Sequence, residues 1–255
     1  MLRRVSVLEA IVVLLAGGVA GAINVAVGSG TLVTFPVLLA VGYSPLVANV
    51  SNTLGLVPGS LAGAVGYREE LRGRRRQVSE FACASVSGGL VGAVLLLVLP
   101  EAAFEVIVPV LVALAVVLVA VQPLVSKKVG APERGGRKAR AGPLLFGWIF
   151  VTGVYGGYFG AAQGVLLLGV MGLMLNDSLQ ELNAIKNVLA GLVNAVAALV
   201  FVFAADVAWE AVGLIAVGAT VGGALGAKVA RKLPPNVLRG VVVVVGLAAF
   251  VQLVS

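Results

Sequence analysis

Residues 21–36 of the chain read GAINVAVGSGTLVTFP, and this stretch decides the fold because glycines interrupt an apolar run there. The tripeptide at 28–30 separates an apolar run over residues 5–27 from a shorter one over residues 31–42. About 20 helical residues are needed to cross about 30 Å of hydrocarbon, so the second run is too short to cross a membrane alone. Backbone groups at a helix break need protein or a water-filled cavity around them. We therefore expect a broken helix inside a membrane protein.

The composition of the whole chain supports this reading. Of its 255 residues, 60% are hydrophobic and only 11% are charged, whereas soluble domains carry about 25% charged residues. Too little charge is available to cover the surface of an ordinary soluble enzyme, which excludes that class. Ten apolar runs follow one another, namely 5–27, 31–42, 46–66, 78–98, 103–125, 143–160, 162–175, 183–204, 208–228 and 236–254.

Several kinds of chemistry are excluded by residue content. The chain has no histidine and a single cysteine, Cys83, so histidine-based catalysis, histidine metal sites and intrachain disulfides are ruled out. The apolar runs show neither a nucleophile–base pair nor a metal triad. We therefore predict a protein that is not an enzyme and that has no cofactor and no metal.

Basic residues gather between the apolar runs, as expected of short cytoplasmic loops beside anionic lipid headgroups. A nucleic-acid surface would interleave basic and aromatic residues on a soluble fold, so we expect no nucleic-acid partner. All but one of the 18 Lys and Arg residues lie in four clusters: Arg3 and Arg4; Arg68, Arg72 and Arg74–Arg76; Lys127, Lys128, Arg134, Arg137, Lys138 and Arg140; Lys228, Arg231, Lys232 and Arg239. The exception is Lys186.

The two halves of the chain share a pattern. GGLVGA at 88–93 recurs as GGALGA at 222–227, and each is followed by Leu-Pro, at 99–100 and 233–234. Both ends give the same offset of 134 residues (222 − 88 and 234 − 100). The short run 162–175 matches the short run of the first half and also follows glycines. Short, glycine-interrupted segments at matching places in two halves are a pointer to the binding site of a transporter.

Charges at equivalent loops have opposite signs. The basic loop at 68–76 corresponds to the acidic turn at 206–210, and the acidic turn at 101–105 corresponds to the basic loop at 228–239. If basic loops stay inside, the halves lie in opposite orientations. That requires an odd number of crossings per half, which five satisfy if each short run crosses as part of a broken element. The N-terminus then lies outside the cytoplasm, although its two arginines weakly favour a cytoplasmic position.

We therefore predict an all-α polytopic membrane protein with two inverted repeats of about five segments each. It has eight full-length helices and two short broken ones. Residues 1–126 form the first repeat, 127–142 a basic cytoplasmic linker and 143–255 the second repeat. Although residues 1–27 are similar to a signal peptide, their break has a counterpart deep in the chain, so we expect them to be retained.

Polar residues mark a candidate site at the breaks, where helix N-termini present free N–H donors and a positive dipole end to an anion. The first-half candidates are Asn24, Gly28, Ser29, Gly30 and Thr31, and the second-half candidates are Tyr155, Gly156, Gly157, Gly160 and Gln163. The third run of each half adds Asn49, Asn52 and Thr53, matched by Asn183, Lys186 and Asn187.

Lys186 is the leading candidate for an anion contact. It shares one helix face with Asn183 and Asn187, because the three are spaced by three and four residues. A buried ammonium is expensive in the bilayer and should face a partner or a cavity. In the alternative interpretation, Lys186 extends to the interface near Asp177 and Glu181.

Glycines at spacing four, such as Gly88 with Gly92 and Gly222 with Gly226, are typical of close helix packing.

These motifs resemble those of the TauE/SafE sulfite exporter family over essentially the whole chain. The stretch at 21–36, with NVSNTL at 49–54, is similar to the first-half motif of the family. GVYGGYFG at 153–160, with NAIKN at 183–187, is similar to its second-half motif. The resemblance implies a permease for sulfite, sulfonates or related organic anions. The family often has a lysine where this chain has Thr53, which leaves substrate charge and coupling open.

From these observations we expect a multi-pass protein of the cell membrane that exports or imports small anions by alternating access at a midplane site. Its partners are then the anionic substrate and the lipid bilayer, while assembly with copies of itself stays open. Two alternatives are an anion channel with the same site and a membrane protein with a structural or assembly role. No carboxylate lies in mid-segment, the nearest candidate for proton coupling being Glu80 at a segment end.

Overall fold

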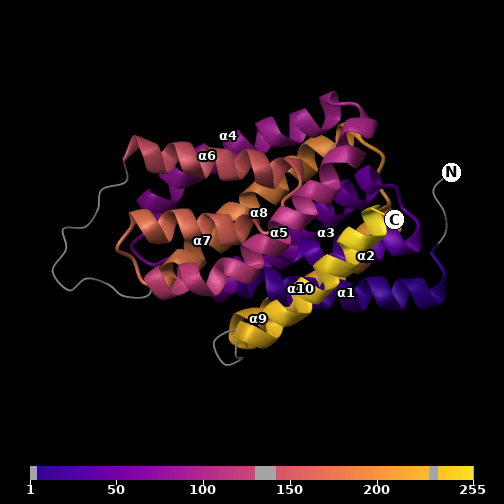
Figure 1. The fold of residues 1–255 in the computed structure, drawn as a ribbon. Coiled ribbons are helices and arrows are strands. Elements are labelled where there is room, and N and C mark those ends of the chain that lie inside the picture. Colours follow the sequence, from indigo (N-terminus) through magenta and orange to yellow (C-terminus); the bar gives the residue numbers. More distant parts are fainter. Residues whose placement is uncertain (1–4, 130–141, 230–234, 255) are drawn as a thin grey trace.

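The computed structural model describes residues 5–129, 142–229 and 235–254, and all regular elements in these ranges are α-helices (Figure 1). In chain order they are α1 (Val7–Ala26), α2 (Thr31–Val41), α3 (Pro45–Gly66), α4 (Arg75–Val98), α5 (Glu101–Val129), α6 (Pro143–Tyr158), α7 (Gln163–Met174), α8 (Leu179–Ala204), α9 (Trp209–Val229) and α10 (Pro235–Val254). The ten helices correspond to the ten predicted runs. Most of the predicted linker, with Arg134, Arg137, Lys138 and Arg140, lies outside the described residues, as do Arg3, Arg4, Arg231 and Lys232.

Within the described residues, five helices are long and apolar enough to cross a membrane: α1, α4, residues Glu101–Gln122 of α5, α8, and residues Trp209–Ala227 of α9. The shorter apolar helices are α2 and α7. The prediction of an all-α, polytopic membrane protein is therefore confirmed. Some boundaries differ from the predicted ones: α5 continues three residues into the predicted linker, and α6 ends at Tyr158, because the chain there enters a turn.

Serine side chains set the start of three helices. Ser6 and Ser178 each form a capping box, with Glu9 and Glu181 three residues later. Ser44 accepts a hydrogen bond from the Val47 amide at the start of α3. Such caps satisfy N–H groups that have no partner inside the helix, so these ends are fixed by local sequence.

The short helices turn back instead of continuing across. After α1 the chain reverses at Gly28, whose φ of +88° favours glycine, and Gly30 then packs against the Ala20 carbonyl of α1. After α6 it reverses at Gly160, with φ of +79°. The expectation that each short run completes a crossing was therefore wrong, because these two turns make each pair a hairpin. Three long helices in each half, α3 to α5 and α8 to α10, run between the ends of the bundle (Figure 1).

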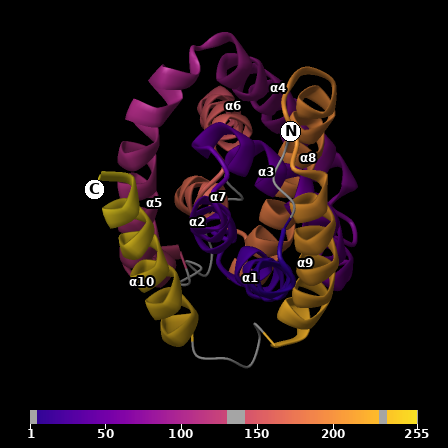
Figure 2. The same ribbon diagram turned by 90° about the vertical axis from the view of Figure 1, so that its right-hand side faces the viewer.

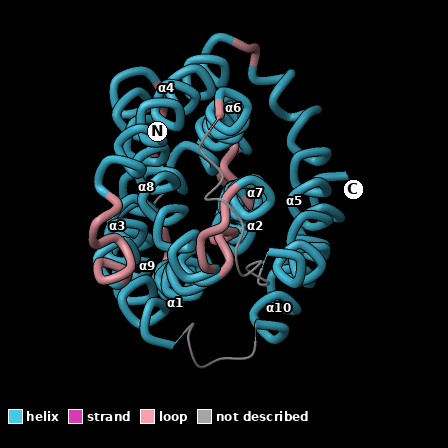
Figure 3. Tube along the Cα trace, turned by 90° about the vertical axis from the view of Figure 1, so that its left-hand side faces the viewer, coloured by secondary structure: helices cyan, strands magenta, loops and turns pink. Residues whose placement is uncertain are grey.

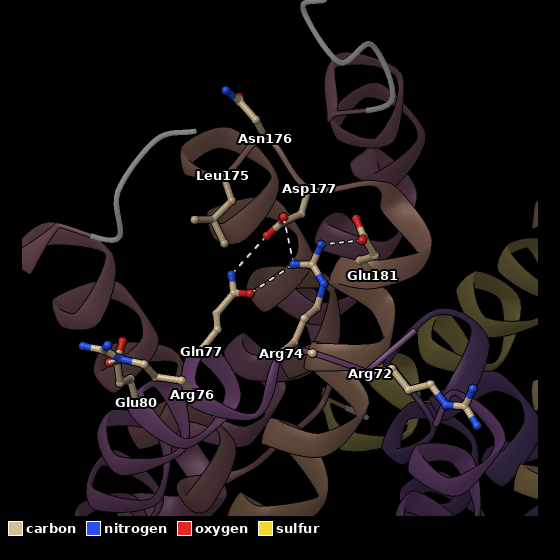
Figure 4. A pocket seen from close by; sticks show the side chains of 10 residues that line it. Arg72, Arg74, Arg76, Gln77, Glu80, Leu175, Asn176, Asp177 and Glu181 are labelled. Atoms are coloured by element: carbon tan, nitrogen blue, oxygen red, sulfur yellow. Dashed lines mark hydrogen bonds and ion pairs between the residues drawn. The ribbon is translucent and has the colours of Figure 1, made fainter. Parts of the chain in front are cut away.

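The hairpins enter from opposite ends. One end, here called the acidic end, holds the starts of α1 and α9, joined by a hydrogen bond from the Val5 amide to Glu210. Ser44, just before α3, donates to Glu101 of α5 at this end. The other end, the basic end, holds the α3–α4 loop beside the start of α8 (Figures 1 and 4). The pair α1–α2 begins and ends at the acidic end, and α6–α7 begins and ends at the basic end.

Helix contacts are exchanged between the two halves. α1 packs on α9 of the other half, and α6 packs on α4 in the same way. Backbones approach closely at glycines: a Cβ on Gly222 would lie 1.8 Å from the Gly18 carbonyl oxygen, and one on Gly92 would lie 2.0 Å from that of Val154. The glycine stripes predicted for packing therefore do pack, and each hairpin is held by the opposite half.

The other contacts between the halves also pair equivalent helices. α3 packs on α9 as α8 packs on α4, and α2 lies on α10 as α7 lies on α5. Viewed along the bundle, α2 and α7 occupy the centre, and the other helices surround them (Figures 2 and 3). The broken segments are therefore the innermost part of the fold.

Candidate functional site

Gly28 and Gly164 bring the two breaks together. The Gly164 amide donates a hydrogen bond of 3.1 Å to the Gly28 carbonyl oxygen. A Cβ on Gly28 would lie 2.5 Å from the Gly164 Cα atom, so only glycine fits this contact. The N-terminal ends of α2 and α7 therefore meet inside the bundle, α2 extending toward the acidic end and α7 toward the basic end (Figure 1). We call this place the junction.

The C-terminal end of α1 is held by three side chains of α8. The Val25 carbonyl oxygen accepts from Lys186 Nζ at 3.0 Å, Asn187 Nδ2 at 3.3 Å and Asn183 Nδ2 at 3.4 Å. Lys186 also donates to the Asn24 carbonyl oxygen at 3.2 Å. The predicted shared face of these three residues is confirmed. Their partners are carbonyl groups at the negative end of a helix dipole, which attract a cation.

Lys186 does not reach the interface. Its side chain is 0% exposed, and its stem passes Gly164, where a Cβ would lie 3.0 Å from Lys186 Cδ. Asp177 and Glu181, the partners considered in the alternative interpretation, are bound by Arg74 instead. The structure therefore excludes that alternative and places the ammonium beside the junction.

The C-terminal end of α6 is held in a corresponding way. Asn49 of α3 donates from Nδ2 to the Tyr158 carbonyl oxygen at 2.9 Å. Asn49 and Asn183 are 134 residues apart (183 − 49), the offset of the sequence repeat. Each of these asparagines therefore caps the broken helix of the other half.

Side chains around the start of α2 form a network of buried and partly buried hydrogen bonds. The Gly30 amide donates to Asn24 Oδ1 at 3.4 Å, while Asn24 Nδ2 donates to Ser60 Oγ at 3.2 Å. Asn52 Nδ2 donates to Thr31 Oγ1 at 3.1 Å, and Thr34 Oγ1 donates to Asn52 Oδ1. Sequence reasoning missed Ser60 and Thr34, although both are hydroxyl residues inside apolar runs, the signal that selected their neighbours.

At the start of α7 the turn is stabilised from within. Tyr155 donates from its hydroxyl to the Ala161 carbonyl oxygen. Gly156 leaves room for Gln163, because a Cβ on it would lie 2.3 Å from Gln163 Cδ. These predicted site residues therefore shape the turn that carries Gln163 to the junction.

Several buried polar atoms of residues at or beside the breaks have no hydrogen-bond partner within the described residues, and four of them are considered for the junction. They are Ser29 Oγ, Gln163 Nε2, Asn49 Oδ1 and Asn183 Oδ1. Buried polar groups normally have partners, so each exception needs an explanation. Ser29 and Gln163 flank the facing helix ends and can both donate to a ligand.

Two predicted site residues have local roles instead. Gly157 packs on α4, since a Cβ there would lie 2.1 Å from the Gly89 carbonyl oxygen. Thr53 donates its hydroxyl to the Asn49 carbonyl oxygen of its own helix at 2.9 Å. Neither residue takes part in the contacts described at the junction.

A pocket of about 590 Å³ opens at the basic end, where sequence reasoning predicted no site (Figure 4). Arg74 lies between Asp177, at 2.8 Å, and Glu181. Gln77 donates to Asp177 at 3.0 Å and accepts from Arg74 at 3.0 Å. Burial by itself lowers the pKa of the Arg74 guanidinium, but its hydrogen bonds to the two carboxylates outweigh this and raise the pKa above its ordinary value. Arg74 is therefore a permanent cation here.

Known proteins resemble this chain over most of its length. A family model described as "Sulfite exporter TauE/SafE" matches residues 13–253. A "Probable membrane transporter protein" of Haemophilus influenzae is 25% identical over 230 residues, covering 89% of this chain and 88% of the relative. YfcA, a "Probable membrane transporter protein" of Escherichia coli K12, is 25% identical over 233 residues, covering 89% and 82%. No solved structure matches.

The whole-chain match and the all-helical membrane architecture agree with the resemblance seen in the motifs. The relatives match nearly end to end, so the fold and the broad class apply to the entire chain. The chain belongs to the TauE/SafE sulfite exporter family and is a multi-pass membrane transporter.

Proposed function

We propose that the protein moves a small anion, such as sulfite, a sulfonate or a related organic anion, and binds it at the junction. The observation that carries this proposal is the meeting of the N-terminal ends of α2 and α7 beside Lys186. Both helix ends favour negative charge. The hydrogen-bond partners of the Lys186 Nζ atom are backbone carbonyl groups, which carry no formal charge, so a protonated Lys186 has no counter-charge among these partners. An anion would neutralise it.

The candidate contacts are the unpartnered donors and the ammonium. Ser29 Oγ and Gln163 Nε2 can donate to an oxyanion, and Lys186 can turn from the carbonyl groups of α1 toward it. Charge-assisted hydrogen bonds of this kind are stronger than neutral ones. Asn49 and Asn183 hold the C-terminal ends of α6 and α1, which lead into the turns before Gln163 and at Ser29.

We infer that transport proceeds by alternating access between inverted halves, with the basic end in the cytoplasm. The exchange of equivalent helix contacts supports two related halves, and hairpins that enter from opposite ends support their inversion. In this arrangement, each hairpin faces one side of the membrane, and the junction is the point that either side can reach. A channel would have the same site without a change that seals it.

Flux into proteoliposomes tests the proposal. We expect saturable uptake of sulfite or sulfoacetate, counterflow with the same anion, and no uptake of a neutral solute of similar size. Lys186→Met should abolish the flux, because it keeps the length of the stem and removes the charge. Gly147→Ala serves as the control, since a Cβ there meets nothing within 4 Å. Flux without saturation or counterflow would indicate a channel, and full flux in Lys186→Met would refute the proposed site.

A further inference from the structure

The Arg74 cluster joins the two halves of the chain at the basic end. Arg74 precedes α4 in the first half, whereas Asp177 and Glu181 lie at and just after the α7–α8 turn in the second half. Figure 4 shows the guanidinium pointing between both carboxylates. One arginine therefore ties the start of α4 to the start of α8 and to the end of the α6–α7 hairpin.

The acidic end is closed differently. Hydrogen bonds join the halves there: an exposed one of 3.2 Å from the Val5 amide to Glu210, and a buried one of 2.9 Å from the Ala208 amide to Ser51 Oγ. In the described ranges no ion pair joins the halves at that end. Within the described residues, the halves are therefore joined by ion pairs at the basic end and by hydrogen bonds at the acidic end.

Apolar side chains fill the space between the cluster and the junction. Leu175 lines the pocket, and Met171, one turn earlier on α7, is 0% exposed. Both belong to a core cluster that also includes Phe81 of α4 and Leu182 of α8. A solute leaving the junction along α7 would have to pass these residues, so this route is closed while the helices around α7, α4 and α8 among them, stay packed together.

We propose that Arg74, with Asp177 and Glu181, is a latch that keeps the junction closed toward the basic end. Release of the latch lets α4 move away from α8 and opens the route past Met171. This inference rests on the proposed transport function. Arg74 and Asp177 are about one-fifth exposed, so water can replace the broken contacts, as a reversible latch requires.

Cysteine labelling tests the latch without knowledge of the substrate. The native cysteine, Cys83, is exposed and is first replaced by alanine. Met171→Cys then reports on the closed route in inside-out vesicles treated with a membrane-impermeant maleimide. We expect Arg74→Ala to raise the labelling rate at least about tenfold, equivalent to about 1.4 kcal/mol. Arg76→Ala is the matched control, because its pair with Glu80 lies within α4, and it should leave the rate unchanged.

A second reporter separates opening of a gate from general loosening. Leu38 of α2 is 0% exposed and lies in the other hairpin. Leu38→Cys should stay unreactive when Arg74 is replaced. An unchanged rate at Met171→Cys, or an equal rise at both reporters, would overturn the latch. If Arg74→Ala does not accumulate, Asp177→Asn combined with Glu181→Gln removes the same ion pairs from the carboxylate side, and the same two outcomes decide.

Charge exchange completes the test. Arg74→Glu with Glu181→Arg should return the labelling rate toward that of the unmodified latch, whereas Arg74→Glu alone should raise it. Failure of the second substitution to lower the rate would overturn the assignment of these partners.

Increased labelling together with no anion flux in the unaltered protein would refute the proposed function but not the latch. Unchanged labelling together with normal anion flux would refute only the latch.

Discussion

The amide of Gly164 donates to the carbonyl oxygen of Gly28 across 3.1 Å, and this bond joins two helix breaks that lie more than half the chain apart. Both backbones approach so closely because neither residue has a side chain. The contact fixes where the N-terminal ends of α2 and α7 meet, and it places Lys186 beside them. The geometry of the junction therefore depends on two positions at which any side chain would clash with the facing backbone.

Alanine at either position should destabilise the protein. In Gly28→Ala and Gly164→Ala the new Cβ would lie 2.5 Å from the facing Cα atom, and overpacking of this kind costs about 1–3 kcal/mol. The positive φ of Gly28 adds strain. Thermal unfolding in detergent measures the effect. Gly147→Ala should be neutral or slightly stabilising, and equal behaviour of all three variants would contradict this account.

Lys186→Met should separate function from stability. The substitution removes a buried charge whose desolvation opposes folding, while Asn183 and Asn187 still donate to the Val25 carbonyl oxygen. We therefore expect a melting temperature equal to or above that of the unaltered protein, together with lost anion flux. A large loss of stability would instead identify Lys186 as a structural clamp.

The two equivalent asparagines should differ in importance. Asn49→Ala removes the donor to the Tyr158 carbonyl oxygen, and a buried group left without a partner costs about 1–3 kcal/mol. Asn183→Ala should cost about 1 kcal/mol or less, because Lys186 and Asn187 remain bound to the same acceptor. Thermal unfolding of the two variants side by side checks the order, and the reverse order would be inconsistent with the observed contacts.

Glycines in the α1–α9 contact offer a matched pair. Gly222→Ala places a Cβ 1.8 Å from the Gly18 carbonyl oxygen, whereas a Cβ on Gly18 itself lies 3.7 Å from its nearest neighbour. We expect Gly222→Ala to lower the yield of folded protein and its melting temperature. Gly18→Ala should be tolerated, since alanine is up to about 1 kcal/mol better than glycine inside a helix. Size-exclusion profiles of both variants compare their yields of folded protein, and a yield of Gly222→Ala equal to that of Gly18→Ala would contradict this expectation.

Most of the helices could be predicted from the sequence, because apolar runs of membrane length are set by the bilayer and not by distant contacts. The breaks at Gly28 and Gly160 were also visible, since glycine-rich interruptions stand out in such runs. Whether a short run crosses or turns back was not visible. The direction is set by packing, as in the approach of Gly30 to Ala20 in α1.

Which residues belong to the candidate site could be predicted from the sequence better than the contacts that these residues make. Helical spacing alone placed Asn183, Lys186 and Asn187 on one face. That this face meets the end of α1 depends on a tertiary contact between residues 158 to 162 positions apart. The Arg74 cluster was missed for the same reason, because its arginine looks like any other charge of a basic loop until α8 is placed next to it.

The exchanged packing of α1 on α9 has a consequence for how the protein is made. The glycine face of α1 leaves the ribosome and enters the bilayer long before its partner is synthesised, and α4 has to wait for α6 in the same way. Neither half can complete its own helix contacts during insertion, so final assembly is a late, post-insertional event. A nascent chain stopped at the midpoint would present two unmatched glycine surfaces to the cell's quality-control machinery.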